Sequence, residues 1–524
     1  MPDTETEERE PLIHAAVRAH ASVQPDAPAL IHHGVAISYA TLDAAADAYA
    51  TELAGHGVGP GTIVPLLLPT GPLAVAVQLA VLKCGAAYAN IDGNWPAARQ
   101  AAIIQQIAPK AVVAQPGAAP ECEAEVVSLA AEDLRDVAAR TRGFSPPVLD
   151  ASAPATVFFT SGTTGMPKGV VVPHRAVTRL FGPRGLAGFG PGHVTPQAAA
   201  IAWDMYAFEV WGQLRSGGAV VFLPDEDHLM PGTLRDLVRT AGVDTVWLTT
   251  SLFNVFVEED VQCFTGVREV LIGGEKLSSG PVRTFLQHHP GIALHNGYGP
   301  AENCMLTTTR LIRPEDCEID AGIPVGTAVP GTNVILLDEE DRPSEPGAPG
   351  EVCISGSGLA VCYLGQPETT AEKFPTLLIG GEHVRVYRTG DIGLVDDEGV
   401  LHFRGRKDRQ VKIRGHRIEP AEIEVAASKI EGLSRCTVIP LTASDGTVTG
   451  LALCYVVAPA DQDSTQPRDA LSESEVRTIL ARTLPTYLVP AVVRRFERFP
   501  VTANGKVDQA ELARVAAAPR GRAR

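Results

Sequence analysis

The chain has 524 residues and a formal net charge of −17, and 45% of its residues are hydrophobic. This length exceeds what one hydrophobic core usually supports, so we expect two or more globular domains. The negative charge repels phosphate backbones, which argues against nucleic acid as a general partner. An anionic ligand would therefore need local cations and backbone N–H groups.

Export and membrane insertion have little support in the sequence. Residues 1–11 are acidic and lack the basic start and apolar core of a secretory signal. The most apolar stretch, residues 63–91, is interrupted by prolines, glycines and a lysine, so it predicts a buried strand, turn and helix rather than a membrane span. The nine cysteines show no C-x-x-C spacing, which favours buried free thiols over zinc sites or disulfides. We therefore expect a cytoplasmic protein with no membrane partner.

Short apolar runs alternate with helix-like stretches up to about Asn333. These runs are TIVPLLL, ATVFFT, GAVVFL, DTVWLTT and REVLIGG, and residues 42–53 form one of the helix-like stretches. Such alternation indicates an α/β fold with largely parallel, buried strands. Beyond Asn333 the chain becomes a series of short strands joined by Gly, Pro and Asp turns, which predicts an antiparallel or barrel-like subdomain.

A smaller α/β unit is predicted after the segment GRKDRQ, residues 405–410. A turn at Asp445 and Gly446 would pair the strands RCTVIPL and GLALCYVV. Ser472 and Glu475 fit a capping box that opens the next helix. We therefore place a boundary near Asp408, between an N-terminal domain of residues 1–408 and a C-terminal domain of residues 409–524.

The stretch TSGTTGMPKG, residues 160–169, combines glycines and hydroxyl side chains with one lysine. Small residues let backbone N–H groups turn toward an anion, while the hydroxyls and Lys168 add donors and charge. The stretch therefore suits a polyphosphate. Gly162, Gly165 and Lys168 do not have the spacing of G-x-x-x-x-G-K-[ST], and Gly169 stands where that pattern has a metal-binding hydroxyl. A P-loop ATPase and a mobile surface loop are the alternatives that this stretch alone leaves open.

Nine segments of the chain resemble, in sequence and in order, the motifs of adenylate-forming enzymes. That superfamily contains nonribosomal peptide synthetase adenylation domains, acyl-CoA synthetases and luciferases. Besides TSGTTGMPKG, the segments are SYATL (38–42), LKCGAAYANID (82–92), NGYGPAE (296–302), GEVCISGSGLAVCYL (350–364), YRTGD (387–391), GRKDRQVKIRGHRIEPAEIE (405–424), LPTYLVP (484–490) and NGKVD (504–508). KIRGHRIE and NGKVD are most similar to amino-acid adenylation domains.

The resemblance implies a fold and an activity. The large N-terminal domain would hold two stacked α/β subdomains and a distorted β-barrel, and the small C-terminal α/β domain would move about a hinge at Asp408. The enzyme would be a ligase in which a substrate carboxylate attacks the α-phosphorus of ATP and pyrophosphate leaves. Catalysis of that step depends chiefly on positioning and charge neutralisation.

The resemblance also implies roles for individual residues. Tyr298 would stack on adenine near Asn296, and Asp391 would accept from the ribose hydroxyls with Arg406 close by. Glu302 would hold Mg²⁺ and act in catalysis. The residues expected to bind ATP are Thr160, Ser161, Gly162, Thr163, Thr164, Lys168, Gly274, Glu275, Asn296, Gly297, Tyr298, Gly299, Asp391, Arg406 and Lys412.

Lys506 would bridge the substrate carboxylate and the α-phosphate, and it is the second expected catalytic residue. The chain departs from the family pattern at Ala301, where a threonine is usual, and in the segments AYANID and AVCY, residues 87–92 and 360–363. The alanine lacks the threonine hydroxyl that would contact the α-phosphate. We expect the other two to lie away from the chemistry.

The segment AWDMYAFEVWGQL, residues 202–214, is similar to the one in which amino-acid adenylation domains place an aspartate against the substrate ammonium. Asp204 occupies that position. The pocket residues expected by resemblance are Asp204, Met205, Phe208, Trp247, Leu271, Gly273, Gly297, Met305, Leu306 and Lys506. The lining is mainly apolar, and two methionines stand where smaller residues are usual. We therefore predict L-alanine as the best substrate, with glycine, 2-aminobutyrate and serine tolerated and valine weaker.

Few residues follow Lys506, and no condensation-like segment precedes the first motif. We therefore expect a free-standing enzyme that passes its aminoacyl group in trans to the phosphopantetheine thiol of a separate carrier protein. An acyl-CoA or aryl-acid ligase of the same fold is one alternative, although it would not need Asp204. A nucleotide-binding relative without catalysis is another, which the presence of Lys506, Glu302 and Asp391 disfavours.

Overall fold

The structure is a computed structural model that describes residues 12–118, 120–162, 165–182, 185–224, 229–345, 347–443, 448–457, 471–500 and 507–518. The chain forms two compact units. The first comprises Met1–Gly93, Ile104–Phe159 and Gly169–Lys407, and the second comprises Asn94–Ile103, Thr160–Lys168 and Asp408–Arg524. Two segments that the sequence-based division placed in the N-terminal domain therefore belong to the second unit.

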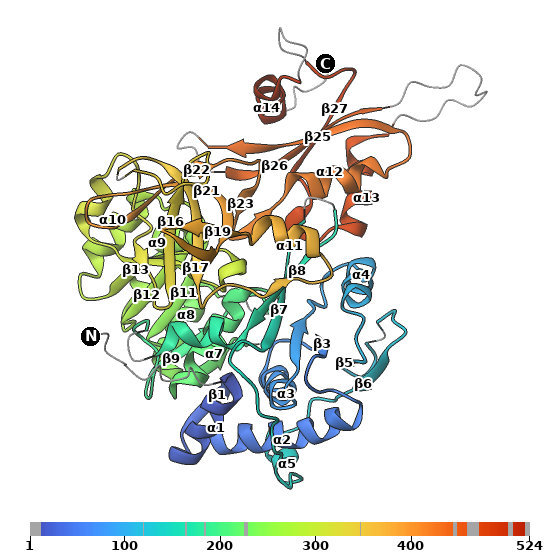
Figure 1. The fold of residues 1–524 in the computed structure, drawn as a ribbon, viewed down its shortest axis with the longest axis vertical. Helices are drawn as coiled ribbons and strands as arrows, with labels where there is room; N and C mark the ends of the chain where they lie inside the picture. The colour runs from blue at the N-terminus through green and yellow to red at the C-terminus, as the bar shows by residue number, and fades with distance from the viewer. Residues whose placement is uncertain are drawn as a thin grey trace, which may run out of the picture. The chain divides into compact units, whose positions relative to one another are not determined.

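A seven-stranded sheet with the order β18-β8-β7-β4-β3-β5-β6 contains the predicted strands TIVPLLL and ATVFFT. Its strands are β3 (Ile63–Leu67), β4 (Ala87–Asn90), β5 (Ala111–Ala114), β6 (Glu125–Ser128), β7 (Pro154–Thr160), β8 (Lys168–Pro173) and β18 (Cys362–Tyr363). Strand β3 pairs in parallel with β4 and β5, whereas the short β18 is antiparallel to β8. Helices α1 (Ile13–Val23), α2 (Tyr39–Gly55) and α3 (Pro72–Lys83) pack on one another (Figure 1). Every residue from Leu73 to Lys83 is buried, so α3 is a core helix.

Two further sheets of the first unit combine parallel and antiparallel strand pairs, whereas the sequence predicted largely parallel strands. One has the order β2-β1-β10-β9 and the other β11-β12-β13-β14-β15. Their strands are β1 (Pro28–His32), β2 (Val35–Ser38), β9 (Val194–Gln197), β10 (Ala219–Phe222), β11 (Thr245–Thr249), β12 (Glu269–Gly273), β13 (Ala293–Tyr298), β14 (Thr308–Leu311) and β15 (Thr327–Ala328). The helical elements over this part of the chain are α5 (Leu134–Ala138), α6 (His174–Thr178), η1 (Arg179–Phe181), α7 (Asp204–Ser216), α8 (Pro231–Ala241), α9 (Thr250–Asp260), η2 (Val261–Phe264), α10 (Ser279–His288), η3 (Ala301–Asn303) and η4 (Pro314–Glu318).

The predicted antiparallel region after Asn333 is confirmed. Strands β16 (Thr332–Leu337), β17 (Gly350–Gly356), β21 (Tyr387–Val395) and β22 (Leu401–Arg406) form one antiparallel sheet. A hairpin of β19 (Thr376–Ile379) and β20 (Glu382–Arg385) follows α11 (Pro367–Lys373). The antiparallel sheet places Asp391 directly opposite Arg406.

The second unit contains the smaller α/β region predicted from the sequence. Its elements are α4 (Ala97–Ile107, in part), the hairpin β23 (Val411–Ile413) and β24 (His416–Ile418), α12 (Pro420–Ser428), β25 (Leu433–Thr442), β26 (Val448–Val457), α13 (Glu473–Thr483), η5 (Thr486–Leu488), β27 (Val492–Phe496) and α14 (Gln509–Ala517). Strands β25 and β26 pair in antiparallel fashion, as expected, although the predicted turn residues Asp445 and Gly446 lie outside the described residues. The capping box of Ser472 and Glu475 opens α13 as predicted.

All nine cysteines are free thiols, and six of them are buried. Among the described residues, no helix combines the length and the apolar character that crossing a bilayer requires. The apolar stretch of residues 63–91 instead folds into β3, α3 and β4, with two strands of one sheet flanking a helix.

Candidate active site

Several of the predicted nucleotide and amino-acid residues of the first unit lie at the carboxyl ends of parallel strands. Strand β13 ends with Asn296, Gly297 and Tyr298, and its neighbour β12 ends with Gly273 directly opposite Gly297. Ligands in open α/β sheets bind in the crevice outside such strand ends. The position of these residues at one edge of the sheet therefore suits a binding site.

A hydrogen-bonded group of three side chains links Tyr298 to the antiparallel sheet. The Tyr298 hydroxyl donates to Asp391 Oδ2 at 2.5 Å, and the Arg406 guanidinium forms an ion pair with Asp391 Oδ1. Arg406 also donates to the carbonyl oxygen of Thr389 at 3.1 Å. Burial raises the pKa of Tyr298 well above its usual value, and the Asp391 carboxylate raises it further. Tyr298 therefore remains a neutral hydrogen-bond donor beside a fixed carboxylate.

Three other predicted nucleotide residues are held by their surroundings in the first unit. The Asn296 amide donates to the carbonyl oxygen of Pro324 at 2.8 Å, which fixes the orientation of that side chain. The Glu275 carboxylate accepts from the Ser251 hydroxyl at 2.6 Å. A β-carbon at Gly299 would lie 2.3 Å from the Met305 carbonyl oxygen, so only glycine fits there.

Glu302 is buried and contacts a segment that the sequence analysis placed away from the chemistry. The Tyr363 hydroxyl donates to Glu302 Oε1 at 2.7 Å, and the Ala360 N–H donates to the Glu302 carbonyl oxygen at 2.8 Å. The two ends of the AVCY segment therefore adjoin the candidate metal ligand, and if Glu302 holds the metal, they lie next to the chemistry.

The residues around Glu302 are compatible with Mg²⁺. This ion prefers hard oxygen ligands and is commonly held by one or two carboxylates together with substrate phosphates. Within the described parts of the chain, no group of three or more His, Cys, Asp or Glu side chains is placed to hold a metal ion. A single oriented carboxylate such as Glu302 fits a metal whose other ligands come from the nucleotide and water.

Asp204 is the first residue of α7 and is half-buried. Its Oδ2 accepts from the backbone N–H of Met305 at 3.2 Å. This bond fixes the carboxylate against the segment between η3 and β14. The two sequence regions predicted to hold the amino acid are thus in direct contact.

The apolar residues predicted to line the amino-acid pocket belong to one buried cluster. Its members include Met205, Phe208, Trp247, Leu271, Met305 and Leu306. Trp247 lies directly opposite Leu271 in the register of β11 and β12. A β-carbon at Gly297 would lie 2.9 Å from Leu306 and 3.3 Å from Leu271. The structure therefore brings these residues together, with little space around Gly297.

The predicted phosphate-binding stretch makes its contacts within the second unit. The Gly162 N–H donates to Glu422 Oε2 at 3.1 Å, and Arg99 forms an ion pair with Glu422 Oε1 at 2.6 Å. The Ser161 hydroxyl donates to the carbonyl oxygen of Arg417 at 2.7 Å. These contacts explain why Asn94–Ile103 and Thr160–Lys168 belong to this unit.

Several predicted site residues belong to the second unit or lie outside the described residues. Thr163, Thr164 and Lys506 are outside them. Lys412 lies on β23, and Asp408 is the first residue of the last segment of the second unit. The proposed roles of all these residues stay predictions.

Comparison with known proteins adds to this geometry. Residues 17–364 match the model of the AMP-binding enzyme family. The chain belongs to the AMP-binding enzymes. It is 34% identical over 504 residues to malpibaldin synthetase of Mortierella alpina, covering 95% of the chain and 9% of that protein. It is 33% identical over 513 residues to tyrocidine synthase 3 of Brevibacillus parabrevis, covering 96% of the chain and 8% of that protein.

A solved structure of similar sequence has the same fold. Holo-PA1221, described as an NRPS protein containing adenylation and PCP domains bound to a vinylsulfonamide inhibitor, has a TM-score of 0.85 and 31% sequence identity. The match covers 97% of this chain and 84% of that one. This AMP-binding enzyme is therefore an adenylate-forming enzyme of the nonribosomal peptide synthetase type. The chain spans less than a tenth of the length of both synthetases.

Some residues of this AMP-binding enzyme that contact the predicted site were missed by sequence reasoning. Thr389 bonds Arg406 through its carbonyl oxygen, and Arg179 bonds carbonyl oxygens next to Met305. Contacts through main-chain atoms leave no side-chain pattern to recognise. Tyr363 could have been found, because it lies in the quoted segment AVCY, but its partner Glu302 is distant in sequence.

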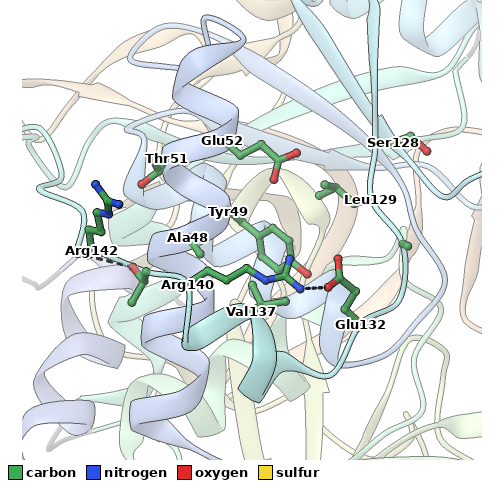
Figure 2. A pocket seen from close by; sticks show the side chains of 13 residues that line it. Ala48, Tyr49, Thr51, Glu52, Ser128, Leu129, Glu132, Val137, Arg140 and Arg142 are labelled. Carbon is green, nitrogen blue, oxygen red and sulfur yellow. Dashed lines mark hydrogen bonds and ion pairs between the residues drawn. The ribbon is translucent and has the colours of Figure 1, made fainter.

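A separate pocket of about 660 Å³ lies among α2, the end of β6 and the residues around α5. Figure 2 shows the ion pair of Arg140 and Glu132 beside the ring of Tyr49. Burial raises the pKa of Tyr49 to about 12, and the nearby Glu132 and Glu52 carboxylates add to the rise. The residues predicted to bind ATP or the amino acid are not among those that line this pocket.

Proposed function

We propose that this AMP-binding enzyme activates a small neutral amino acid, with L-alanine as the best substrate, and transfers it to the phosphopantetheine thiol of a carrier protein. The observation that carries the proposal is the position of Asp204. Its carboxylate lies at the start of α7, bonded to the Met305 N–H, beside an apolar cluster. A carboxylate in such surroundings favours a cationic partner, which a substrate ammonium would supply.

The size of the substrate follows from the residues of the apolar cluster. Met205 and Met305 are both buried in it, and Leu271 and Leu306 would approach any β-carbon at Gly297 closely. Each additional methylene changes discrimination by only about 1–3 kcal/mol in an apolar pocket. Alanine is therefore favoured, valine is weaker, and charged or amide side chains would lose their hydrogen-bond partners.

In the adenylation step, a substrate carboxylate oxygen forms a bond to the α-phosphorus of ATP and the bond to pyrophosphate breaks. Lys506 would neutralise the charge shared by the carboxylate and the α-phosphate. Asp391, which Arg406 and Tyr298 hold in place, would accept hydrogen bonds from the ribose. Mg²⁺ held by Glu302 would neutralise phosphate charge.

In the transfer step, the carrier thiol forms a bond to the acyl carbon and AMP leaves. The similarity to an NRPS protein that contains adenylation and PCP domains supports a carrier protein as the acceptor. The amino acid would be attached as a thioester.

A pyrophosphate-exchange panel tests the proposal. It would include glycine, alanine, 2-aminobutyrate, serine, valine, leucine, propionate and aryl acids. We expect alanine to give the highest kcat/KM. Propionate, which lacks the ammonium, should be at least about 100-fold weaker, because a hydrogen-bonded charge pair that the bound substrate covers contributes about 2–5 kcal/mol. A preference for propionate or aryl acids would identify an acyl or aryl ligase instead. If none of the acids supports pyrophosphate exchange, the protein is better described as a nucleotide-binding relative without catalysis.

A further inference from the structure

The segment from Asn303, the last residue of η3, to Leu306 has an unusual backbone. Cys304 and Met305 have φ angles of 51° and 72°. Residues with a β-carbon seldom adopt this left-handed region, and such conformations persist only where surrounding contacts determine them. We call these four residues the pocket loop. Its conformation needs a structural cause.

Arg179 supplies contacts that hold the pocket loop. One terminal nitrogen of its guanidinium donates to the carbonyl oxygens of Asn303 at 2.8 Å and Leu306 at 2.6 Å. The other terminal nitrogen donates to the Cys304 carbonyl oxygen at 3.5 Å. Arg179 is only 2% exposed, so these bonds form away from water. Hydrogen bonds from a charged donor in such a site are stronger than neutral ones.

The other side of the guanidinium is also enclosed. Its Nε donates to the Thr332 hydroxyl at 3.4 Å, and a terminal nitrogen donates to the Ala176 carbonyl oxygen. A β-carbon at Gly358 would lie 2.6 Å from Arg179 Cζ. The arginine therefore cannot rotate away without moving its neighbours. It ties the pocket loop to η1, to the start of β16 and to the turn after β17.

The pocket loop carries two groups of the predicted amino-acid site. The side chains of Met305 and Leu306 belong to the apolar cluster, and the Met305 N–H donates to Asp204 Oδ2. A shift of the loop would move the apolar wall and the carboxylate together. The loop conformation thus couples the size of the pocket to the position of the ammonium partner.

We propose that Arg179 is a positioning residue that determines substrate specificity by holding the pocket loop. The proposal rests on the proposed function, because it assigns Met305, Leu306 and Asp204 to the amino-acid site. Lysine cannot replace arginine in this role, since it offers three donors on one nitrogen instead of five in a rigid plane. The guanidinium geometry, and not the charge alone, is what the loop requires.

The test compares Arg179→Lys and Arg179→Gln with the wild type in pyrophosphate exchange, measuring kcat and KM for ATP, for the best acid of the wild-type panel and for its next larger homologue. We expect the KM for the best acid to rise about tenfold or more. The ratio of kcat/KM for the best acid to kcat/KM for the larger homologue should fall about tenfold, which is the usual effect of one methylene on such a ratio. The KM for ATP should stay within about threefold, because the nucleotide residues are held by other contacts.

Arg18→Met is the matched control. Arg18 is a partly buried arginine that bonds the Phe144 carbonyl oxygen and pairs with Asp43 and Asp47, at a distance in sequence from the pocket loop. Its loss should lower thermal stability without changing the ratio of the two acids. If folded Arg179 variants keep the wild-type ratio within about threefold, or if Arg18→Met changes it equally, the proposal is wrong.

A second variant covers the case in which the Arg179 variants do not fold. The Asn303 amide also donates to the Leu306 carbonyl oxygen, at 3.3 Å, so Asn303→Ala loosens the same loop. It should change the ratio in the same direction, and an unchanged ratio would overturn the proposal. Because the ratio uses whichever acid the wild type prefers, an aryl or acyl preference would reject the proposed function without deciding the role of Arg179.

Discussion

The amino-acid part of the predicted site and its glycine-rich stretch are held in different ways. Around the amino acid, buried apolar side chains and the pocket loop fix one another, and Arg179 bonds the loop through its carbonyl oxygens. In the glycine-rich stretch, the Gly162 N–H instead bonds the Glu422 carboxylate. Packing determines the shape of the first region, whereas in the second region a backbone N–H already donates to the carboxylate of a glutamate. Substitutions in the two regions should therefore change different kinetic constants.

The largest effect is expected for Lys506→Ala, which removes the cation predicted to contact the α-phosphate. Loss of a cation that neutralises the transition state should lower adenylation by about 10³-fold, while the melting temperature stays unchanged. Lys429→Ala, at an exposed lysine of the same unit, is the matched control. Pyrophosphate exchange within about tenfold of the wild type would reject the assigned role.

Asp204→Asn tests the amino-acid side. The amide can still accept from the Met305 N–H but no longer attracts the substrate ammonium. We expect KM for alanine to rise about 100-fold with little change in KM for ATP, since hydrogen-bonded charge pairs contribute about 2–5 kcal/mol. The discrimination between alanine and propionate should collapse in the same assay. Asp338→Asn, at a carboxylate that pairs with Arg342, is the control, and equal changes in both variants would contradict the ammonium role.

Asp408→Pro separates the two half-reactions. Proline fixes φ, and hinge motions require φ and ψ to change in a few residues. We expect carrier loading to fall by at least about tenfold more than pyrophosphate exchange. Asp408→Ala removes the bond from the Gln410 N–H without fixing φ, so it should preserve loading. Carrier loading would be measured by mass spectrometry of the carrier, and adenylation by pyrophosphate exchange. Equal losses of the two activities in Asp408→Pro would count against a hinge.

Met305→Ala tests whether the methionines limit the size of the amino-acid pocket. Removal of a side chain that is only 2% exposed should enlarge the pocket and shift preference toward valine or leucine by about tenfold. Met205→Ala should act in the same direction. Met230→Ala removes an exposed methionine and should leave the preference unchanged. If the wild type already favours valine over alanine by tenfold, the two methionines do not limit the pocket.

The smallest effect concerns Glu209, on the helix that also carries Asp204. Burial raises the pKa of Glu209 from 4.5 to about 8, although the Ala199 and Ala198 N–H groups oppose the rise. The folded state therefore holds a proton that the unfolded state has lost between pH 4.5 and 8. The contribution of this group to stability is complete below the lower value and falls as pH rises, by at most about 1.4 kcal/mol per pH unit.

Glu209→Gln should remove that dependence. Denaturant unfolding at pH 5 and pH 8 would measure the difference, and the variant should gain stability relative to the wild type at the higher pH. If the stability of the wild type and that of Glu209→Gln change by the same amount between pH 5 and pH 8, Glu209 does not bind the proton.

Much of the fold could be predicted because local patterns decide it. The runs TIVPLLL, ATVFFT, GAVVFL, DTVWLTT and REVLIGG all became strands, and the capping box of Ser472 and Glu475 opens α13. Short apolar runs and capping chemistry extend over only a few residues, so the sequence displays them directly. The assignment of residues 94–103 and 160–168 to the second unit was missed, because it depends on contacts such as that between Arg99 and Glu422, 323 positions apart.

The sequence by itself determined the family, the order of its motifs, several of the strands and helices, and the candidate residues Asp204, Glu302 and Asp391. Only the tertiary structure revealed that Arg179 holds the pocket loop and that Tyr363 orients Glu302. The physical reason is that Arg179 bonds carbonyl groups 124 to 127 positions away, and carbonyl groups are the same in every residue. Side-chain chemistry can be recognised in a sequence, whereas a main-chain contact exists only after the chain has folded.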